Sequence, residues 1–169
     1  MKVTEMTGVF TELEELADRY APDIDIPTPP MIDQVRRNVA LRARLLAEFG
    51  AVDAEEVADL VQSAARRRTA TVENWRRACR VVAVRWLGRT LVPGFQLLKD
   101  GQPDPNLRPV FEVLHEQGFG DWESALWWTV PSPALDGARP VDLLLELRER
   151  EDGGAERLVA AARRRRDWF

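Results

Sequence analysis

The sequence contains one cysteine, Cys79, and one histidine, His115. A single cysteine cannot form an internal disulfide, which is consistent with a reducing compartment, so we expect the protein in the cytoplasm. No run of about 18 apolar residues is present, and we therefore expect no membrane-spanning helix. The N-terminal stretch is acidic and lacks a basic segment followed by an apolar one, so no secretory signal peptide is predicted.

Residues suited to catalysis are also scarce. One histidine without a second histidine or a cysteine cluster does not supply the usual ligands of zinc, and it disfavours a Ser/His/Asp set. No glycine-rich phosphate-binding loop is present. We interpret Cys79 as a packing residue. We therefore expect no enzymatic activity, no cofactor and no metal, and an enzyme with an unrecognised pocket is the weakest alternative.

Lysine is rare, with 2 residues against 22 arginines, while alanine, leucine and valine are plentiful. This bias is typical of a GC-rich genome and favours a bacterial source. The net charge of −4 is unevenly distributed. Residues 60–99 contain nine basic residues and a single acidic one, Glu73, whereas residues 1–30 and 100–152 are acidic. A concentrated basic region in an acidic chain is typical of phosphate binding, so double-stranded DNA is the expected partner.

The periodicity of apolar residues predicts a mainly α fold in three segments. Residues 1–30 form an acidic helix over 10–20 and a proline-rich linker. Residues 31–99 form a winged helix–turn–helix, and residues 100–169 form a small helical domain for binding a partner protein. The turn-rich sequence DGQPDPNLRP after Lys99 marks the predicted boundary between the last two.

The winged helix–turn–helix is predicted from the order of its elements. A long helix from Met31 to Phe49 ends at Gly50, and Asp53 is a good N-cap for a short helix over 54–61. A basic turn and a second short helix over 71–80 follow. The alternation from Val82 to Trp86, with a turn at 87–89 and a return over 90–96, then predicts a β-hairpin. Further helices are expected at 107–117, 121–130, 140–151 and 154–166.

In such modules the second short helix enters the major groove and the hairpin, or wing, contacts neighbouring phosphates or the minor groove. Val72, Trp75 and Cys79 are expected to face the core, while Asn74 and Arg77 face outward, where they can pair with adenine and guanine. The residues expected to contact DNA are Arg66, Arg67, Arg68, Thr69, Thr71, Asn74, Arg77, Arg80, Arg85 and Arg89. The alternative is that these arginines form a solvated face or pair with the acidic C-terminal segment.

The C-terminal segment is rich in tryptophan, and either two or three of these side chains form its core or one is an exposed interface anchor. The stretch Ala125-Leu126-Trp127-Trp128, followed by Pro133-Ala134-Leu135-Asp136-Gly137-Ala138-Arg139-Pro140 and Leu143-Leu144, resembles the toxin-binding domain of Xre/MbcA/ParS-type antitoxins. Gly88, Val92, Pro93, Phe95 and Gln96 also look like the hairpin that precedes this domain in actinobacterial relatives. The resemblance covers about residues 31–150.

The resemblance implies an antitoxin that pairs with a RES-domain toxin and represses its own promoter together with it. RES-domain toxins are enzymes that degrade NAD⁺. We expect a homodimer, because dimers bind two half-sites. The residues expected to contact the partner protein are Trp127, Trp128, Arg139, Arg163, Arg166, Trp168 and Phe169. The last residues, with four arginines before Trp168, are alternatively a solvated end. The function predicted is thus an antitoxin-like transcription regulator, with a protein-only adaptor or a solitary regulator without a toxin partner as alternatives.

Overall fold

The computed structural model describes residues 29–150 and 155–164. The chain divides into two compact units, residues 1–40 and 41–169, and helix α2 (Pro29–Phe49) contains the junction between them. The predicted helix over residues 10–20 lies outside the described residues. None of the described helices is both long and apolar enough to cross a membrane.

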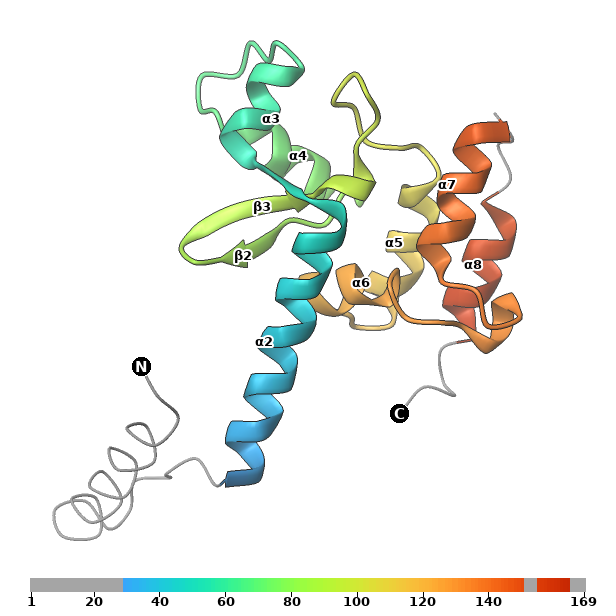
Figure 1. Ribbon diagram of the computed structural model, residues 1–169. Coiled ribbons are helices and arrows are strands. Elements are labelled where there is room, and N and C mark those ends of the chain that lie inside the picture. Colours follow the sequence, from blue (N-terminus) through green and yellow to red (C-terminus); the bar gives the residue numbers. More distant parts are fainter. Residues whose placement is uncertain (1–28, 151–154, 165–169) are drawn as a thin grey trace, which may run out of the picture. The chain divides into compact units, whose positions relative to one another are not determined.

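The predicted mainly α fold with a β-hairpin is confirmed (Figure 1). The first part of the larger unit follows α2 with β1 (Ala51–Asp53), α3 (Ala54–Leu60), α4 (Ala70–Arg77), β2 (Val84–Trp86) and β3 (Arg89–Pro93). The three strands form an antiparallel sheet in the order β1–β3–β2. The short strand β1 pairs with β3 through Val52 and Val92, and it joins the hairpin to the start of α3. This is the element order of a winged helix–turn–helix, with β2–β3 as the wing.

Local sequence signals explain where the short helices begin and end. The Asp53 side chain accepts a hydrogen bond from the Glu55 N–H, and Glu56 accepts one from the Asp53 N–H, so α3 begins with the capping box that Asp53 predicts. Helix α4 ends at Arg77 rather than at the predicted Arg80. It ends earlier because Cys79 adopts a left-handed conformation (φ +52°) and the Arg80 N–H bonds to the Trp75 carbonyl.

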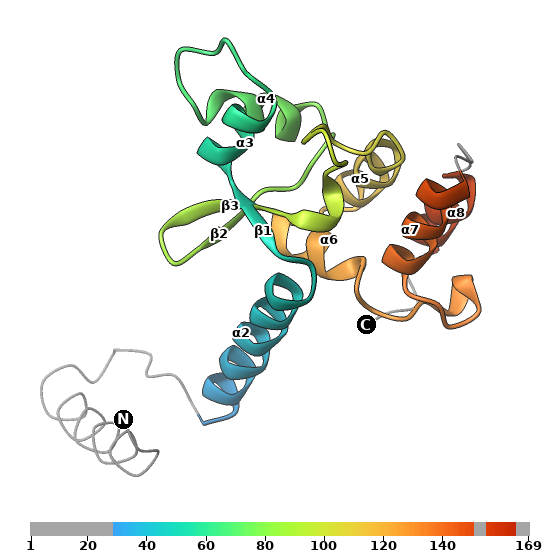
Figure 2. The ribbon, with the colours of Figure 1, turned by 45° about the horizontal axis from the view of Figure 1, so that its top comes forward.

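The C-terminal helices are α5 (Leu107–Glu116), α6 (Asp121–Trp127), α7 (Pro140–Arg150) and α8 (Glu156–Arg163). Helix α8 packs against α5 and α7, and α7 and α8 lie side by side in both views (Figures 1 and 2). Two short 3-10 helices, η1 (Gly94–Gln96) and η2 (Pro133–Leu135), shape the connections.

The larger hydrophobic cluster is built from both parts of the unit 41–169. Val84 and Phe95 from the winged part pack with residues of α5, α6, α7 and α8, including Trp128 and Leu144. A smaller cluster, centred on Val57, holds α3 and α4 to the sheet. The predicted boundary at residues 99/100 therefore lies within one compact unit whose main core draws on both sides of it.

Candidate nucleic-acid interface

Helix α4 is held on the sheet by its apolar side, which leaves a polar side facing outward. Val72 and Trp75 are buried in the smaller cluster. Asn74 and Arg77 are exposed, as predicted, and the Arg77 guanidinium donates a hydrogen bond to the Asn74 side-chain oxygen at 2.6 Å. Arg80 is half-buried, with its guanidinium 5.5 Å from the centre of the Trp75 ring. Asn74 and Arg77 are thus the side chains that α4 presents together.

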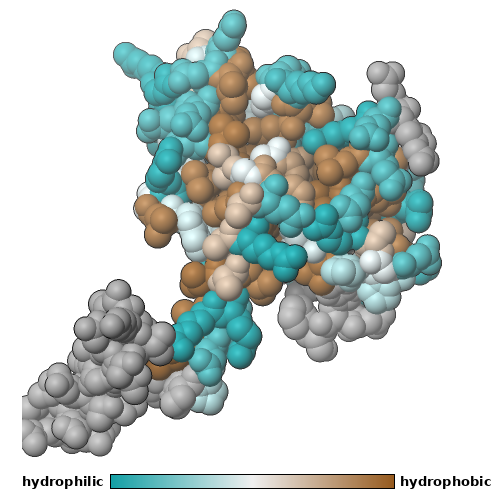
Figure 3. Space-filling view, in the orientation of Figure 1, coloured by the Kyte–Doolittle hydropathy of each residue, from teal (hydrophilic) through white to brown (hydrophobic). Residues whose placement is uncertain are grey.

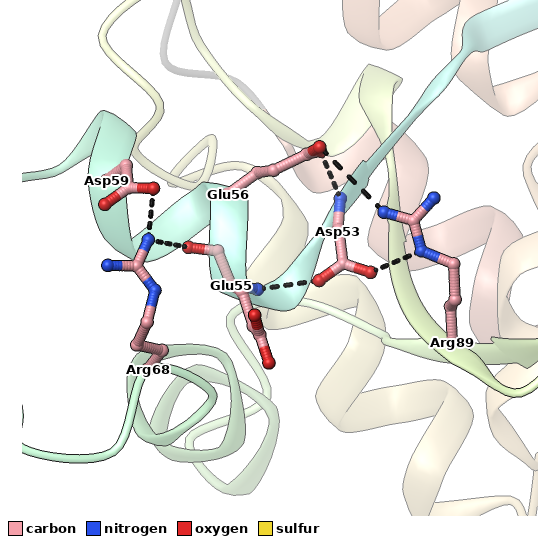
Figure 4. A network of polar contacts seen from close by, with 6 residues as sticks. All are labelled: Asp53, Glu55, Glu56, Asp59, Arg68 and Arg89. Atoms are coloured by element: carbon pink, nitrogen blue, oxygen red, sulfur yellow. Dashed lines mark hydrogen bonds and ion pairs between the residues drawn. The ribbon is translucent and has the colours of Figure 1, made fainter.

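The connecting turn (residues 61–69) carries three exposed arginines, and two of them are paired with carboxylates. Arg67 pairs with Glu73 of α4, and Arg68 pairs with Asp59 of α3 and donates to the Glu55 carbonyl (Figure 4). The hydrogen bond from Arg68 holds the pKa of the Asp59 carboxyl below its usual value. Arg66 makes no ion pair with any residue that the structure describes.

The two threonines predicted to meet phosphate, Thr69 in this turn and Thr71 in the first turn of α4, are half-buried. The Thr69 hydroxyl donates to a Glu73 carboxylate oxygen at 3.2 Å, and the hydroxyls of Thr71 and Ser63 share a hydrogen bond of 2.7 Å. Both hydroxyls therefore hold the turn against α4 in this structure. Their contact with phosphate stays a prediction.

The wing is anchored on two sides by the residues next to its turn, Trp86 and Arg89. Arg89 of β3 donates to the Asp53 carboxylate at 2.9 Å and lies 3.9 Å from Glu56, which ties the wing to the start of α3 (Figure 4). On the other side, the Trp86 ring meets the edge of Trp122 of α6. The Trp122 indole N–H also donates to the carbonyl oxygen of Arg85. The Arg85 side chain is exposed on this anchored wing.

Arg76 is not among the residues predicted to contact DNA, yet it is exposed on α4 and pairs with Asp121 of α6 at 2.9 Å. Its position within the basic region could have indicated it, but its acidic partner lies 45 residues later in the chain. Four arginines of this surface thus have carboxylate partners within the described residues: Arg67, Arg68, Arg76 and Arg89. Their side chains remain between 50% and 70% exposed, so they are still accessible to an external anion. Hydrophilic side chains cover the end of the molecule where α3 and α4 meet (Figure 3).

Two residues predicted to bind a partner protein are buried instead. Trp127 is 5% exposed and Trp128 is 0% exposed. The Trp128 ring packs against Phe95, Phe111 and Trp127, with ring centres 5.1–5.8 Å apart. The prediction that these two tryptophans are surface anchors is therefore wrong for this fold. The alternative, that they form the core, is correct.

The motif that carries the family resemblance forms a compact turn between α6 and α7. Asp136 and Gly137 both have positive φ, and the Gly137 N–H bonds to the Ser132 carbonyl at 2.9 Å. Leu135 and Leu144 are buried in the larger cluster. Arg139 is half-buried, and its guanidinium donates hydrogen bonds to the carboxylates of both Asp142 and Glu48.

The Arg139–Asp142 pair gives the fold a dependence on pH. The hydrogen bonds from Arg139 lower the pKa of Asp142 from its ordinary value of 3.8. Because the folded protein favours the carboxylate form of Asp142, this pair stabilises the fold at pH values above the ordinary pKa of 3.8. That contribution is lost as the pH falls through the lowered pKa. We expect Asp142→Asn to lower the free energy of unfolding at pH 7 by at most about 1 kcal/mol, because solvent screens a side chain that is 44% exposed. In urea titrations at a series of pH values, the difference from the wild type should shrink as the pH falls below 3.8 and vanish once Asp142 is protonated in the folded protein. A difference that grows in acid would contradict this assignment.

Of the other predicted partner residues, Arg163 is exposed near the end of α8, while Arg166, Trp168 and Phe169 lie outside the described residues. Arg163 and Arg164 border a hollow of about 820 Å³ between the start of α5 and α8. Apolar residues, including Pro109 and Val159, and the acidic Glu156 also line it.

Cys79 and His115, which are far apart in the sequence, both line a hollow of about 480 Å³ between the end of α4 and α5. Burial raises the pKa of the Cys79 thiol, which disfavours the reactive thiolate. Within residues 29–150 and 155–164, no group of three or more histidine, cysteine or acidic side chains could hold a metal ion.

The fold is similar to that of a solved structure. No protein-family model matches the sequence, and no curated protein matches it. The chain is similar to the one in the NMR structure of Rv2175c, with 29% sequence identity and a TM-score of 0.50. The match covers 66% of this chain and 80% of that chain, so the likeness extends over most of both molecules.

Proposed function

We propose that this protein binds double-stranded DNA by inserting α4 into the major groove. The observation that carries the proposal is the outward pair Asn74 and Arg77 on a short helix that a buried tryptophan fixes on a winged scaffold. Arginine can bond bidentately to guanine and asparagine to adenine, and these contacts distinguish base pairs in the major groove. Arg66 and Arg85, both exposed, are suited to the phosphates on either side.

The alternative is an adaptor that binds only proteins. The ion pairs of Arg67, Arg68, Arg76 and Arg89 favour it, because each pair reduces the positive potential of the surface. These pairs are exposed, however, and such pairs contribute little energy, so phosphate can compete for the same guanidinium groups.

Titration of a duplex selected from a random-sequence pool tests the proposal. The logarithm of the binding constant should fall linearly with the logarithm of salt concentration, with a slope of about −0.9 for each phosphate contacted. We expect Arg66→Ala to weaken binding to all sequences and reduce this slope by about 1. Arg77→Ala should instead relax base preference at one position, by about 1–3 kcal/mol.

Arg157→Ala is the matched control, because Arg157 is an exposed arginine of α8. Its affinity for the duplex should equal that of the wild type. If the wild type does not bind any duplex at about 50 mM salt, where electrostatic binding is strong, the adaptor is the better description.

We also propose that the protein acts as a homodimeric transcription regulator in the bacterial cytoplasm, with no catalytic role. Met31, Val35 and Val39 of α2 are exposed at intervals of four residues, which places them on one face of the helix and makes them available to a second copy. A dimer would bind two half-sites and so reach a useful affinity. Sedimentation equilibrium with the full chain measures the stoichiometry, and a monomer at all concentrations would contradict this part.

The partner protein implied by the family resemblance is a RES-domain toxin, and we retain this as a narrower proposal. The hollow lined by Arg163, Arg164 and several apolar residues supports a protein contact, since such a lining suits an acidic, partly apolar segment. Co-expression with a RES-domain protein encoded beside it, followed by co-purification, tests the pairing. Failure to co-purify would favour a solitary regulator.

A further inference from the structure

The tip of the wing displays a leucine in an unfavourable setting. Leu87 and Gly88 both have positive φ, of 47° and 81°, which defines the two-residue type I′ turn of the β2–β3 hairpin. Asparagine, aspartate or glycine normally fills the first position, because other side chains are strained there. Leu87 is also 88% exposed, so its apolar surface remains in water. Neither packing nor turn geometry in the described protein explains a leucine at this position.

Leu87 projects into solvent from the turn of an anchored hairpin. In both views the β2–β3 hairpin extends from the body as a separate loop, and its tip is hydrophobic on the surface (Figures 1, 2 and 3). The residues directly before and after the turn are fixed by the contact between Trp86 and Trp122 and by the Arg89–Asp53 ion pair. A strained, exposed side chain on a rigid support is typical of a contact site rather than of a structural position.

The charges around the tip identify the partner. The hairpin from Val84 to Pro93 contains two arginines and no acidic residue. Arg89 is paired with Asp53 and Glu56 of the neighbouring elements, whereas Arg85 makes no ion pair within the described residues. The minor groove has a negative potential that attracts arginine, and apolar side chains, including leucine, can be inserted there between base pairs. A purely apolar pocket on a protein would accept the leucine but would offer no anion to Arg85.

We propose that Leu87 is a wedge that enters the minor groove beside the site of α4, separates two stacked base pairs and bends the duplex. The proposal rests on the DNA binding proposed above and adds how the wing contributes to it. Arg85 would contact the groove next to the wedge, while Arg89 keeps the wing attached to α3. The inserted leucine favours steps that unstack easily, such as TA, so it would also select sequence.

Leu87→Asn separates the structural role of this residue from its role in binding. Asparagine suits the first position of a type I′ turn, so the variant should melt about 3 °C higher than the wild type. The duplex selected with the wild type, labelled at both ends for energy transfer and carrying 2-aminopurine at its TA steps, reports bending and unstacking. We expect the wild type to shorten the end-to-end distance and raise the 2-aminopurine fluorescence. The variant should bind about 10-fold more weakly and lose both signals, since an apolar wedge supplies them.

Leu87→Met is the control that keeps an apolar tip, and it should retain most of the bending. Equal affinity and equal bending by Leu87→Asn and the wild type would overturn the wedge while leaving DNA binding intact. Weaker binding without any change in bending or fluorescence would also overturn it, because Leu87 would then contact the duplex without insertion. If the wild type fails to bind any duplex, the proposed function itself is wrong, and that result is distinct from the other two.

Discussion

Arg148→Met is expected to lower the free energy of unfolding by about 3–5 kcal/mol, because it leaves a buried carboxylate without its partner. The side chain of Asp104 is 1% exposed, and its carboxylate accepts a hydrogen bond from the guanidinium of Arg148. A second Arg148 nitrogen donates to the carbonyl oxygen of Phe95 in η1. The substitution therefore removes the cation that compensates a desolvated charge and a backbone hydrogen bond together. Urea denaturation at neutral pH measures the loss.

The double variant Asp104→Asn/Arg148→Met tests this reasoning. Asparagine removes the buried charge and keeps an oxygen that can accept from the Asn106 N–H, which bonds to Asp104 at 2.8 Å in the wild type. The double variant should therefore be more stable than Arg148→Met alone, since neutralising both partners removes the unpaired charge. Arg157→Met on the exposed face of α8 should change stability by less than about 0.5 kcal/mol. A similar cost for both single substitutions would contradict the assignment.

Gln96→Leu is expected to lower the free energy of unfolding by about 3 kcal/mol, since it leaves two buried backbone groups unpaired. Gln96 is 0% exposed. Its side-chain oxygen accepts from the Val82 N–H at 2.8 Å, and its side-chain nitrogen donates to the Val82 carbonyl at 3.0 Å. Val82 lies in the segment between α4 and the wing, so the hydrogen bonds from Gln96 fix the path of the chain from α4 to the wing. Urea denaturation measures the stability.

Gln102→Leu is the matched control, because Gln102 is half-buried and its side chain makes no hydrogen bond within the described residues. It should cost less than about 0.5 kcal/mol. Amide hydrogen exchange supplies a second measurement, because the Val82 N–H should lose its protection in Gln96→Leu before the protein unfolds globally. Unchanged protection at Val82 would contradict the role given to Gln96.

Local signals in the sequence predict most of the described elements. The N-cap at Asp53, the alternation before the wing and Gly50 after α2 each act through neighbouring residues, and the structure places those elements as expected. The prediction that α4 ends at Arg80 is wrong, because the helix ends where Cys79 adopts a left-handed conformation. A glycine there would have indicated this helix end, but a cysteine does not.

The candidate site was harder to predict, because its contacts join residues far apart in the chain. The exposed positions of Asn74 and Arg77 follow from helical periodicity. The pairing of Arg76 with Asp121 does not, and neither does the burial of Trp127 and Trp128, which depends on Phe95 and Phe111 lying beside them. The number of basic residues in the sequence overstates the positive charge of this surface for the same reason. Asp59 of α3 pairs with Arg68, and Asp53, directly before α3, pairs with Arg89.

The first turn of α6 connects the two elements that we expect to contact DNA. Asp121 bonds to Arg76 on α4, and the adjacent Trp122 contacts Trp86 and the backbone of the wing. A rotation of α6 would consequently shift both elements at once and alter the distance between them. If a partner protein rotated α6 on binding, it would therefore change the affinity of the proposed DNA site without contacting the DNA.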